Sequence, residues 1–210
     1  VDKKLYKNLK SGINTKQVEV LVGREGLIEV SKRKDVNVML NGLVGSSGME
    51  PTLSAIKTGI NVALANKESL VMAGGIINKA MELSGAKIFP VDSEHSAIWQ
   101  CLVGENFNDI RRIILTGSGG PFRSRDLDTF DDISVKEALK HPNWSMGKKI
   151  SIDSATMMNK VFEIIEAKNI FNIDLKKLSI LIHPNSYLHA VIVFNNGMIK
   201  LIAHDTTMEI

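Results

Sequence analysis

Short apolar runs alternate with helix-length segments through the first ninety residues, and this alternation constrains the fold more than any other feature. The apolar runs predict strands at residues 18–22, 36–40, 61–65 and 87–91. Helices are predicted at residues 51–58 and 69–84, and the second ends at Gly85, a residue type that commonly terminates helices. A repeated strand–helix order is typical of α/β proteins with a doubly wound parallel sheet.

The pattern changes to α+β from Asp92 onward. Apolar runs rich in β-branched residues predict strands at residues 178–182 and 188–194. Asn195-Asn196-Gly197, followed by residues 198–203, predicts a hairpin, because Asn-Gly favours the tight turn between antiparallel strands. The expected domains are residues 1–91, with a parallel sheet, and residues 92–210, with a mixed sheet.

Composition narrows the class of protein. Of the 210 residues 44% are hydrophobic, enough for a core, and no apolar run approaches the roughly 20 residues that cross a bilayer. The net charge of +3 is scattered and aromatic residues make up only 5%, so neither a nucleic-acid partner nor a membrane span is expected. The single cysteine, Cys101, lies in an apolar helix-like stretch, where an inert buried thiol and a reducing, cytoplasm-like compartment are expected.

Asp92 and Glu94 stand one residue apart directly after the apolar run 87–91. At a strand end both side chains would project from the same side and could reach one divalent cation, with Ser93 turned toward whatever the cation binds. A solvated loop is the alternative, because two acids at this spacing are common by chance.

Residues 141–163 predict a loop, a short strand and then a helix with Ser154 as its N-cap. Asn159, Lys160 and Glu163 are three or four residues apart, so they share one helix face. The apolar stripe of this helix is expected to consist of Met157, Val161, Ile164 and Ile165. The alternative is an exposed polar face with a weak Lys160–Glu163 ion pair.

A third segment runs from a buried-type strand at residues 113–116 into the turn Gly117-Ser118-Gly119-Gly120. Glycines allow a backbone to approach an anion closely and to expose its N–H groups, and Ser118 adds a hydroxyl donor. A plain turn is the alternative. Serine, amide and ammonium donors together predict a phosphate site, next to a cation site made of three carboxylates: Asp92, Glu94 and Glu163.

Five ordered motifs resemble one protein family. They are Ala65–Ser69, Val91–His95, Leu115–Arg123, His141–Gly147 and Ser154–Lys160. The motifs are similar to those of the 1-deoxy-D-xylulose 5-phosphate reductoisomerase family, and the match runs from about residue 36 to residue 189. The resemblance implies the later half of a Rossmann-like NADPH domain followed by an α+β catalytic domain. It also implies that the family's Gly-rich dinucleotide loop lies upstream and a helical domain downstream, so a central fragment, inactive by itself, is expected.

The resemblance also implies an activity: NADPH-dependent rearrangement and reduction of 1-deoxy-D-xylulose 5-phosphate to 2-C-methyl-D-erythritol 4-phosphate, in non-mevalonate isoprenoid biosynthesis. One divalent ion, Mn²⁺ or Mg²⁺, would withdraw charge from the substrate oxygens. Its implied ligands are Asp92, Glu94 and Glu163, an oxygen-only set that disfavours Zn²⁺. The family implies a homodimer in the bacterial cytoplasm or, in a eukaryote, in a plastid.

The other roles follow from the motifs residue by residue. The implied catalytic residues are Lys67, Glu94, His141 and Glu163. The implied substrate contacts are Lys67, Ser93, Glu94, Ser118, His141, Trp144, Met146, Ser154, Asn159, Lys160 and Glu163. The implied NADPH contacts are Asn66, Glu68 and Gly147, and the loop Gly42–Gly48 is expected to line the cofactor with its backbone. Residues 138–149 are expected to form a lid in which Trp144 closes over the substrate; Trp144 packed on its own domain is the alternative.

The resemblance weakens toward both ends of the chain. Residues 1–35 carry little family signature, and residues 201–208 lack the proline of the family's usual Gly-x-Pro-Asp-Met stretch, which leaves the shape of that loop open. Two alternatives remain. One is a Rossmann-type NAD(P)-dependent dehydrogenase of the homoserine or phosphate-sugar class, which should lack the combination of Asp92, Glu94 and Ser118. The other is a non-catalytic dimerisation fragment.

Overall fold

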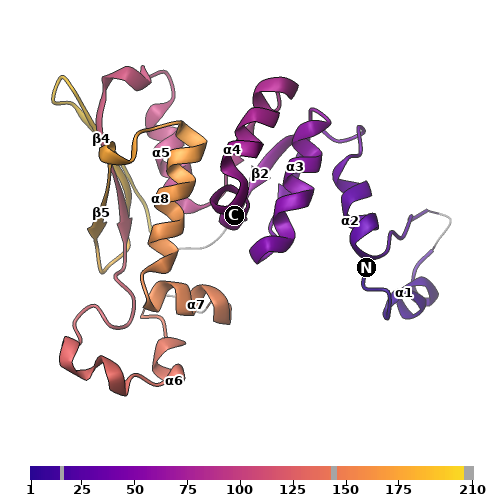
Figure 1. The fold of residues 1–210 in the computed structure, drawn as a ribbon, viewed down its shortest axis with the longest axis horizontal. Helices are drawn as coiled ribbons and strands as arrows, with labels where there is room; N and C mark the ends of the chain where they lie inside the picture. Colours follow the sequence, from indigo (N-terminus) through magenta and orange to yellow (C-terminus); the bar gives the residue numbers. More distant parts are fainter. Residues whose placement is uncertain (15–16, 143–145, 206–210) are drawn as a thin grey trace. The chain divides into compact units, whose positions relative to one another are not determined.

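The computed structural model describes residues 1–14, 17–142 and 146–205. The chain divides into two compact units, Val1–Phe89 and Pro90–Ile210, and each is described by itself (Figure 1).

The first unit is built on a three-stranded sheet in the order β1-β2-β3. Its elements are α1 (Tyr6–Gly12), α2 (Gly23–Ser31), β1 (Val38–Asn41), η1 (Gly45–Gly48), α3 (Met49–Lys57), β2 (Asn61–Leu64), α4 (Lys67–Ser84) and β3 (Ile88–Pro90). β1 and β2 run parallel, with Val38 opposite Asn61. Its fully buried apolar side chains include Ala55, Ile56, Val62, Leu64, Leu70 and Ile77. The predicted strand–helix alternation with a parallel sheet is confirmed, and so is the stop at Gly85, which caps α4 with a φ of 74°.

The strand predicted at residues 18–22 is wrong. A strand needs a partner that accepts and donates its backbone hydrogen bonds. Within the described residues, the stretch 18–22 joins neither sheet.

The second unit is built on a four-stranded mixed sheet in the order β5-β4-β6-β7. Its elements are α5 (Ser93–Leu102), η2 (Phe107–Asp109), β4 (Ile110–Gly117), η3 (Leu127–Asp132), α6 (Val135–Ala138), α7 (Lys148–Ala155), α8 (Met158–Phe171), η4 (Leu175–Lys177), β5 (Leu178–Ile182), β6 (Leu188–Phe194) and β7 (Ile199–Ala203). β4 pairs parallel with β5 and antiparallel with β6, and β6 and β7 form the predicted hairpin. The predicted mixed sheet is therefore confirmed.

Helices α5 and α8 cover one face of this sheet, where the core of the unit lies (Figure 1). The core combines side chains from both helices with the inward residues of the strands: Ile98, Cys101, Ile113, Leu115, Ala167, Phe171, Ile192 and Phe194. Cys101 is buried, as predicted, and this burial raises the pKa of its thiol. In the part of the chain that the structure describes, no helix has the length and apolarity needed to cross a membrane.

The short strand predicted ahead of Ser154 is also wrong, because residues 148–155 form helix α7. Ile150 and Ile152, on either side of Ser151, imitate the two-residue period of a strand, yet Ser151 is the buried member of the three. Its N–H and hydroxyl donate to the Gly147 carbonyl at 3.1 and 3.0 Å, closing the first helical turn. Ser154 therefore lies in the last turn of α7, and α8 begins only after Met157, whose φ is 59°.

Candidate metal and phosphate site

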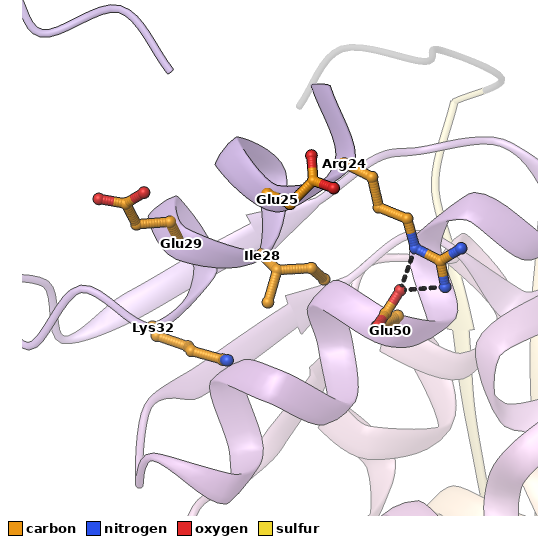
Figure 2. A pocket seen from close by; sticks show the side chains of 6 residues that line it. All are labelled: Arg24, Glu25, Ile28, Glu29, Lys32 and Glu50. Atoms are coloured by element: carbon orange, nitrogen blue, oxygen red, sulfur yellow. Dashed lines mark hydrogen bonds and ion pairs between the residues drawn. The ribbon is translucent and has the colours of Figure 1, made fainter. Parts of the chain in front are cut away.

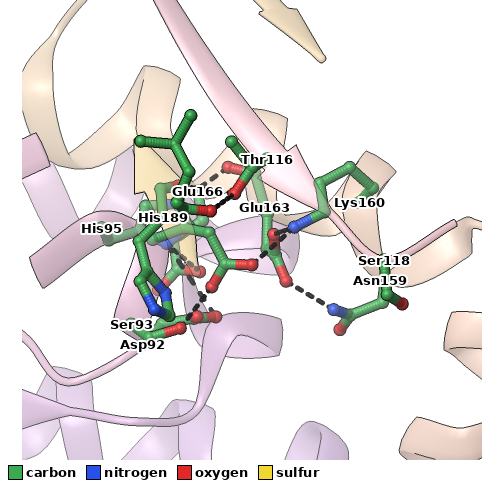
Figure 3. A network of polar contacts seen from close by, with 12 residues as sticks. Asp92, Ser93, His95, Thr116, Ser118, Asn159, Lys160, Glu163, Glu166 and His189 are labelled. Carbon is green, nitrogen blue, oxygen red and sulfur yellow. Dashed lines mark hydrogen bonds and ion pairs between the residues drawn. The ribbon is translucent and has the colours of Figure 1, made fainter. Parts of the chain in front are cut away.

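Three carboxylates from two helices of the second unit converge. Asp92 occupies the N-cap position of α5 without a side-chain capping hydrogen bond, Glu94 lies in the first turn of that helix, and Glu163 lies in α8. One oxygen of each lies within 4.8 Å of the others, and Figure 3 shows Asp92 and Glu163 in this network. The predicted convergence is present, but the strand-end reasoning behind it is wrong: the start of a helix, where partial positive charge favours acids, brings Asp92 and Glu94 together. Such an all-oxygen set fits a hard divalent cation such as Mg²⁺ or Mn²⁺.

The ammonium of Lys160 lies against two of these carboxylates. Its Nζ donates to Oε1 of Glu94 at 2.7 Å and also to Oε2 of Glu163. Burial alone would lower the pKa of Lys160, but the charges of Glu163 and Glu94 outweigh it and raise the pKa above its ordinary value. The two carboxylates therefore favour the charged form of Lys160.

The polar face of α8 is buried, contrary to the exposed-face alternative. Lys160 is 5% exposed and Glu163 is 1% exposed, and Asn159 Nδ2 donates to Oε1 of Glu163. Val161, placed in the predicted apolar stripe, is 46% exposed, so that part of the prediction is wrong. The helix turns its charged face inward because the carboxylates and Lys160 satisfy one another there.

The Gly-rich turn after β4 packs against both α7 and α8. A Cβ at Gly117 would lie 2.8 Å from Cε of Lys160, and one at Gly120 would lie 2.6 Å from the Ser154 carbonyl oxygen. Gly119 and Gly120 have φ values of 83° and 68°, in the left-handed region that favours glycine. The turn, Lys160 and the end of α7 are thus in direct contact, which brings Ser118, Ser154, Asn159 and Lys160 into one neighbourhood.

His141 joins this neighbourhood through Ser118. Its Nε2 lies 3.1 Å from Ser118 Oγ, and that hydroxyl also accepts from the Gly120 N–H at 3.2 Å. Burial, and after it the charge of Arg123, lowers the pKa of His141. The neutral imidazole is therefore the favoured form.

The remaining predicted residues of the second unit are Ser93, Met146, Gly147 and Trp144. Ser93 Oγ donates to Oε2 of Glu94 at 2.6 Å, Met146 is half-buried, and Gly147 is the N-cap of α7. Trp144 lies outside the described residues, as does Met208, so the predicted lid at 138–149 is described only in part.

Three predicted residues lie at the start of α4 in the first unit. Asn66 is 1% exposed, and its Nδ2 donates to the carbonyls of Leu43 at 2.5 Å and Gly45 at 2.9 Å. Its Oδ1 accepts the Ser69 N–H at 3.0 Å, so it caps α4 while it holds the loop Gly42–Gly48. Lys67 is 9% exposed and Glu68 is half-buried.

The sequence reasoning gave no role to two fully buried residues of the network, His95 and Glu166. Helical spacing offered a signal, because His95 follows Asp92 by three residues and Glu166 follows Glu163 by three. His189, also buried, was missed as well; burial, followed by the neighbouring His204, lowers its pKa.

A surface pocket of the first unit lies between α2 and α3 (Figure 2). Its lining residues are Arg24, Glu25, Ile28, Glu29, Lys32 and Glu50. Nε of Arg24 donates to Oε2 of Glu50 at 2.6 Å across one side. None of the predicted site residues lines this pocket.

The fold and the site define an α/β protein with an all-oxygen candidate cation site beside donors suited to an anion. The family model described as 1-deoxy-D-xylulose 5-phosphate reductoisomerase matches residues 1–74, and the model for the C-terminal domain of that enzyme matches residues 88–171. The chain belongs to the 1-deoxy-D-xylulose 5-phosphate reductoisomerase family.

Relatives and solved structures agree with this assignment. The reductoisomerase of Chloroherpeton thalassium is 48% identical over 200 residues, which are 95% of this chain and 52% of that protein. A crystal structure of DOX-P reductoisomerase in complex with NADPH, fosmidomycin and magnesium is similar with a TM-score of 0.89 and 38% identity over 99% of this chain and 54% of its own. The Zymomonas mobilis enzyme in complex with NADPH gives a TM-score of 0.90 and 42% identity, with 99% and 53% coverage. The chain spans about half the length of the curated relatives it matches.

Proposed function

We propose that this chain is the central part of a reductoisomerase that converts 1-deoxy-D-xylulose 5-phosphate to 2-C-methyl-D-erythritol 4-phosphate with NADPH, in non-mevalonate isoprenoid biosynthesis. Residues 1–91 would belong to its NADPH-binding domain and residues 92–210 to its catalytic domain. The observation that carries the proposal is the convergence of Asp92, Glu94 and Glu163 beside Lys160 and the Gly-rich turn. Family membership adds support.

Asp92, Glu94 and Glu163 would bind one Mg²⁺ or Mn²⁺, for which their oxygen-only donor set is suited. Bound there, the cation supplies Lewis acidity to the oxygens of the ketose carbonyl and its neighbouring hydroxyl. Ser93 holds Glu94 through its hydroxyl hydrogen bond, and Asn159 holds Glu163 through its amide. Both supports orient carboxylate oxygens toward the shared centre.

The substrate phosphate would bind among Ser118, Ser154, Asn159 and Lys160. Lys160 supplies the positive charge, in keeping with the raised pKa that its carboxylate neighbours give it. Ser118 and the glycine N–H groups supply neutral donors at a turn open enough for an anion to approach. Once phosphate is bound, Lys160 divides its hydrogen bonds between the phosphate and Glu94.

His141 would close the substrate pocket as a neutral imidazole that donates or accepts one hydrogen bond, in keeping with its lowered pKa. Met146 and Trp144 would cover the substrate, and Lys67 would donate to the end of the substrate that is rearranged. Glu68 and Gly147 would contact NADPH. Because Asn66 is engaged with Leu43 and Gly45, its contribution would be to hold the loop Gly42–Gly48 in place for the cofactor.

We further propose a homodimer, acting in the cytoplasm of a bacterium or the plastid of a eukaryote, without nucleic-acid or membrane partners. The face of the four-stranded sheet opposite α5 and α8 carries a group of apolar side chains among a few polar ones, and the apolar members include Ile114, Leu181, Val191, Val193, Ile199 and Leu201. Ile199 and Leu201 are 59% and 51% exposed. A contiguous apolar sheet face is a typical subunit interface. Leu201→Glu should convert the full-length dimer to a monomer in sedimentation velocity.

The activity is tested by NADPH oxidation with the full-length protein. Oxidation should require both 1-deoxy-D-xylulose 5-phosphate and Mn²⁺ or Mg²⁺, and Glu94→Gln should abolish it. Glu105→Gln, which alters a partly buried ion pair with Lys200 away from the proposed site, serves as the matched control and should retain full activity. Oxidation that needs a different substrate would support another dehydrogenase class. A chain encoded naturally without the upstream strand would instead support a dimerisation fragment.

A further inference from the structure

A fully buried imidazole joins the two helices that carry the candidate cation ligands. His95 Nδ1 lies 3.5 Å from Oε2 of Glu166 and 3.9 Å from Oδ2 of Asp92. His95 Nε2 lies 2.9 Å from the backbone carbonyl oxygen of Glu163. The ring thus contacts Asp92 at the start of α5 and the α8 backbone at Glu163, and Figure 3 shows it with Asp92 and Glu166.

The chemistry of these contacts fixes the orientation of the ring. A carbonyl oxygen only accepts hydrogen bonds, so Nε2 of His95 must carry a hydrogen and donate it to Glu163. That leaves Nδ1 facing the carboxylates of Glu166 and Asp92. The ring also stacks on Phe171, with centroids 6.5 Å apart and planes 6° from parallel, which removes its freedom to rotate.

Oε2 of Glu166 and Oδ2 of Asp92 therefore face the same ring nitrogen, and they attract the ring when Nδ1 also carries a hydrogen. Both Glu166 and His95 are 0% exposed, so bulk solvent reaches neither. A carboxylate buried at this position is costly unless it pairs with a group of complementary charge or a donor, and His95 is the imidazole beside it.

We infer that Glu166 is a positioning residue: acting through His95, it holds Asp92 and the backbone of Glu163 in the arrangement that binds the divalent cation. The inference rests on the proposed function of Asp92, Glu94 and Glu163. Groups that orient metal ligands in this way typically change metal affinity by about 10- to 100-fold when they are lost.

A second cation site is the competing explanation, since one ligand atom each of Asp92, His95 and Glu166 also lies within 4.8 Å of the others. Formal charge does not separate the two explanations. Asp92, Glu94, Glu163 and Glu166 carry at most four negative charges, so with Lys160 one divalent cation leaves a net charge of about −1 and two leave about +1. The number of Mn²⁺ ions bound per chain separates them.

The test is Mn²⁺ binding to the full-length protein, followed by electron paramagnetic resonance of free and bound Mn²⁺. The wild type should bind one Mn²⁺ per chain. Glu166→Gln, which keeps the side-chain volume and removes the charge, should raise the dissociation constant about tenfold or more and change the spectrum of bound Mn²⁺. Glu166→Asp, which keeps the charge on a shorter side chain, should give an intermediate constant. NADPH affinity should stay unchanged in both variants.

Glu105→Gln is the matched control in the same unit and should bind Mn²⁺ as the wild type does. If Glu166→Gln has the same Mn²⁺ dissociation constant and spectrum as the wild type, the inference is overturned.

If the wild type binds two Mn²⁺ per chain and Glu166→Gln binds one, the inference is overturned in favour of a second cation site. A wild type that binds no Mn²⁺ contradicts the proposed function itself, which separates that failure from a failure of the positioning role. If Glu166→Gln does not fold, the Mn²⁺ dissociation constant of Glu166→Asp provides the test. A value equal to that of the wild type would contradict the positioning role.

Discussion

The ammonium nitrogen of Lys160 lies 2.7 Å from Oε1 of Glu94, although 66 positions separate the two residues in the sequence. Their side chains are 6% and 16% exposed, so water screens this pair little. The same ammonium contacts Glu163. A divalent cation at the proposed site would share two carboxylates with Lys160, and each cation would reduce the attraction of those carboxylates for the other.

Replacing Lys160 with methionine should separate these two roles. In Lys160→Met the carboxylates lose a competing cation, so Mn²⁺ should bind the full-length protein about tenfold more tightly, given that a charge-assisted hydrogen bond contributes roughly 1.5–3 kcal/mol. The affinity for the sugar phosphate should fall in the same variant. Isothermal titration calorimetry measures both. Lys149→Met, which removes an exposed ion pair with Asp153, should change neither, and weaker Mn²⁺ binding in Lys160→Met would contradict the competition.

A glycine pair in the first unit tests the loop held by Asn66. A Cβ at Gly48 would lie 2.5 Å from Cγ of Asn66, whereas a Cβ at Gly75 would meet nothing within 4 Å. Gly48→Ala should lower the thermal unfolding midpoint and weaken NADPH binding, because overpacking costs about 1–3 kcal/mol. Gly75→Ala, inside helix α4, should leave the midpoint unchanged or raise it. Equal midpoints for the two variants would show that the loop relaxes without cost.

The turn after β4 can be tested with another pair of glycines. Gly120→Ala combines a left-handed φ of 68° with a Cβ only 2.6 Å from the Ser154 carbonyl oxygen. It should raise KM for the sugar phosphate while Mn²⁺ affinity stays the same. Gly104 also has a left-handed φ, of 77°, but a Cβ there would meet nothing within 4 Å. Gly104→Ala therefore serves as the control, because it introduces backbone strain of about 1–3 kcal/mol without a steric contact. A normal KM in Gly120→Ala would contradict the contact between the turn and α7.

The lowered pKa of His141 predicts a pH dependence with a definite sign. Between the lowered folded pKa and the ordinary value near 6.5, the unfolded chain binds more protons than the folded one, so stability rises with pH across that window. Below both pKa values this contribution no longer changes. A midpoint below 6.5 is expected in an NMR titration of the His141 ring, and Arg123→Gln should move it upward. A midpoint at or above 6.5 would contradict the burial of the ring.

The sequence predicted the parts of the fold that short-range chemistry decides. Gly85 ends α4, the Asn-Gly turn joins β6 to β7, and the apolar run of β4 leads into its glycine turn. Residues 18–22 have the composition of a strand but join neither described sheet, and the presence of a neighbouring strand is a tertiary fact that no local pattern contains. Ser151 lies between two isoleucines, a pattern that predicts a strand. The segment is helical instead, and the Ser151 hydroxyl donates to the Gly147 carbonyl in its first turn.

The candidate site was predicted through its motifs more than through its geometry. Amphipathic periodicity assigns charged residues to solvent, so it could not show that Lys160 and Glu163 face inward. Only the approach of α5 to α8 makes that burial tolerable, because it supplies Glu94 as a partner. The sequence did not predict a role for His95 or Glu166, because their contacts join α5 to α8 and depend on how the two helices pack.

The most direct test of the account is anomalous diffraction from crystals of the full-length protein grown with Mn²⁺. The account predicts one strong peak per chain, within about 2.5 Å of a carboxylate oxygen from each of Asp92, Glu94 and Glu163. A peak held by other residues, or none at a saturating Mn²⁺ concentration, would contradict it.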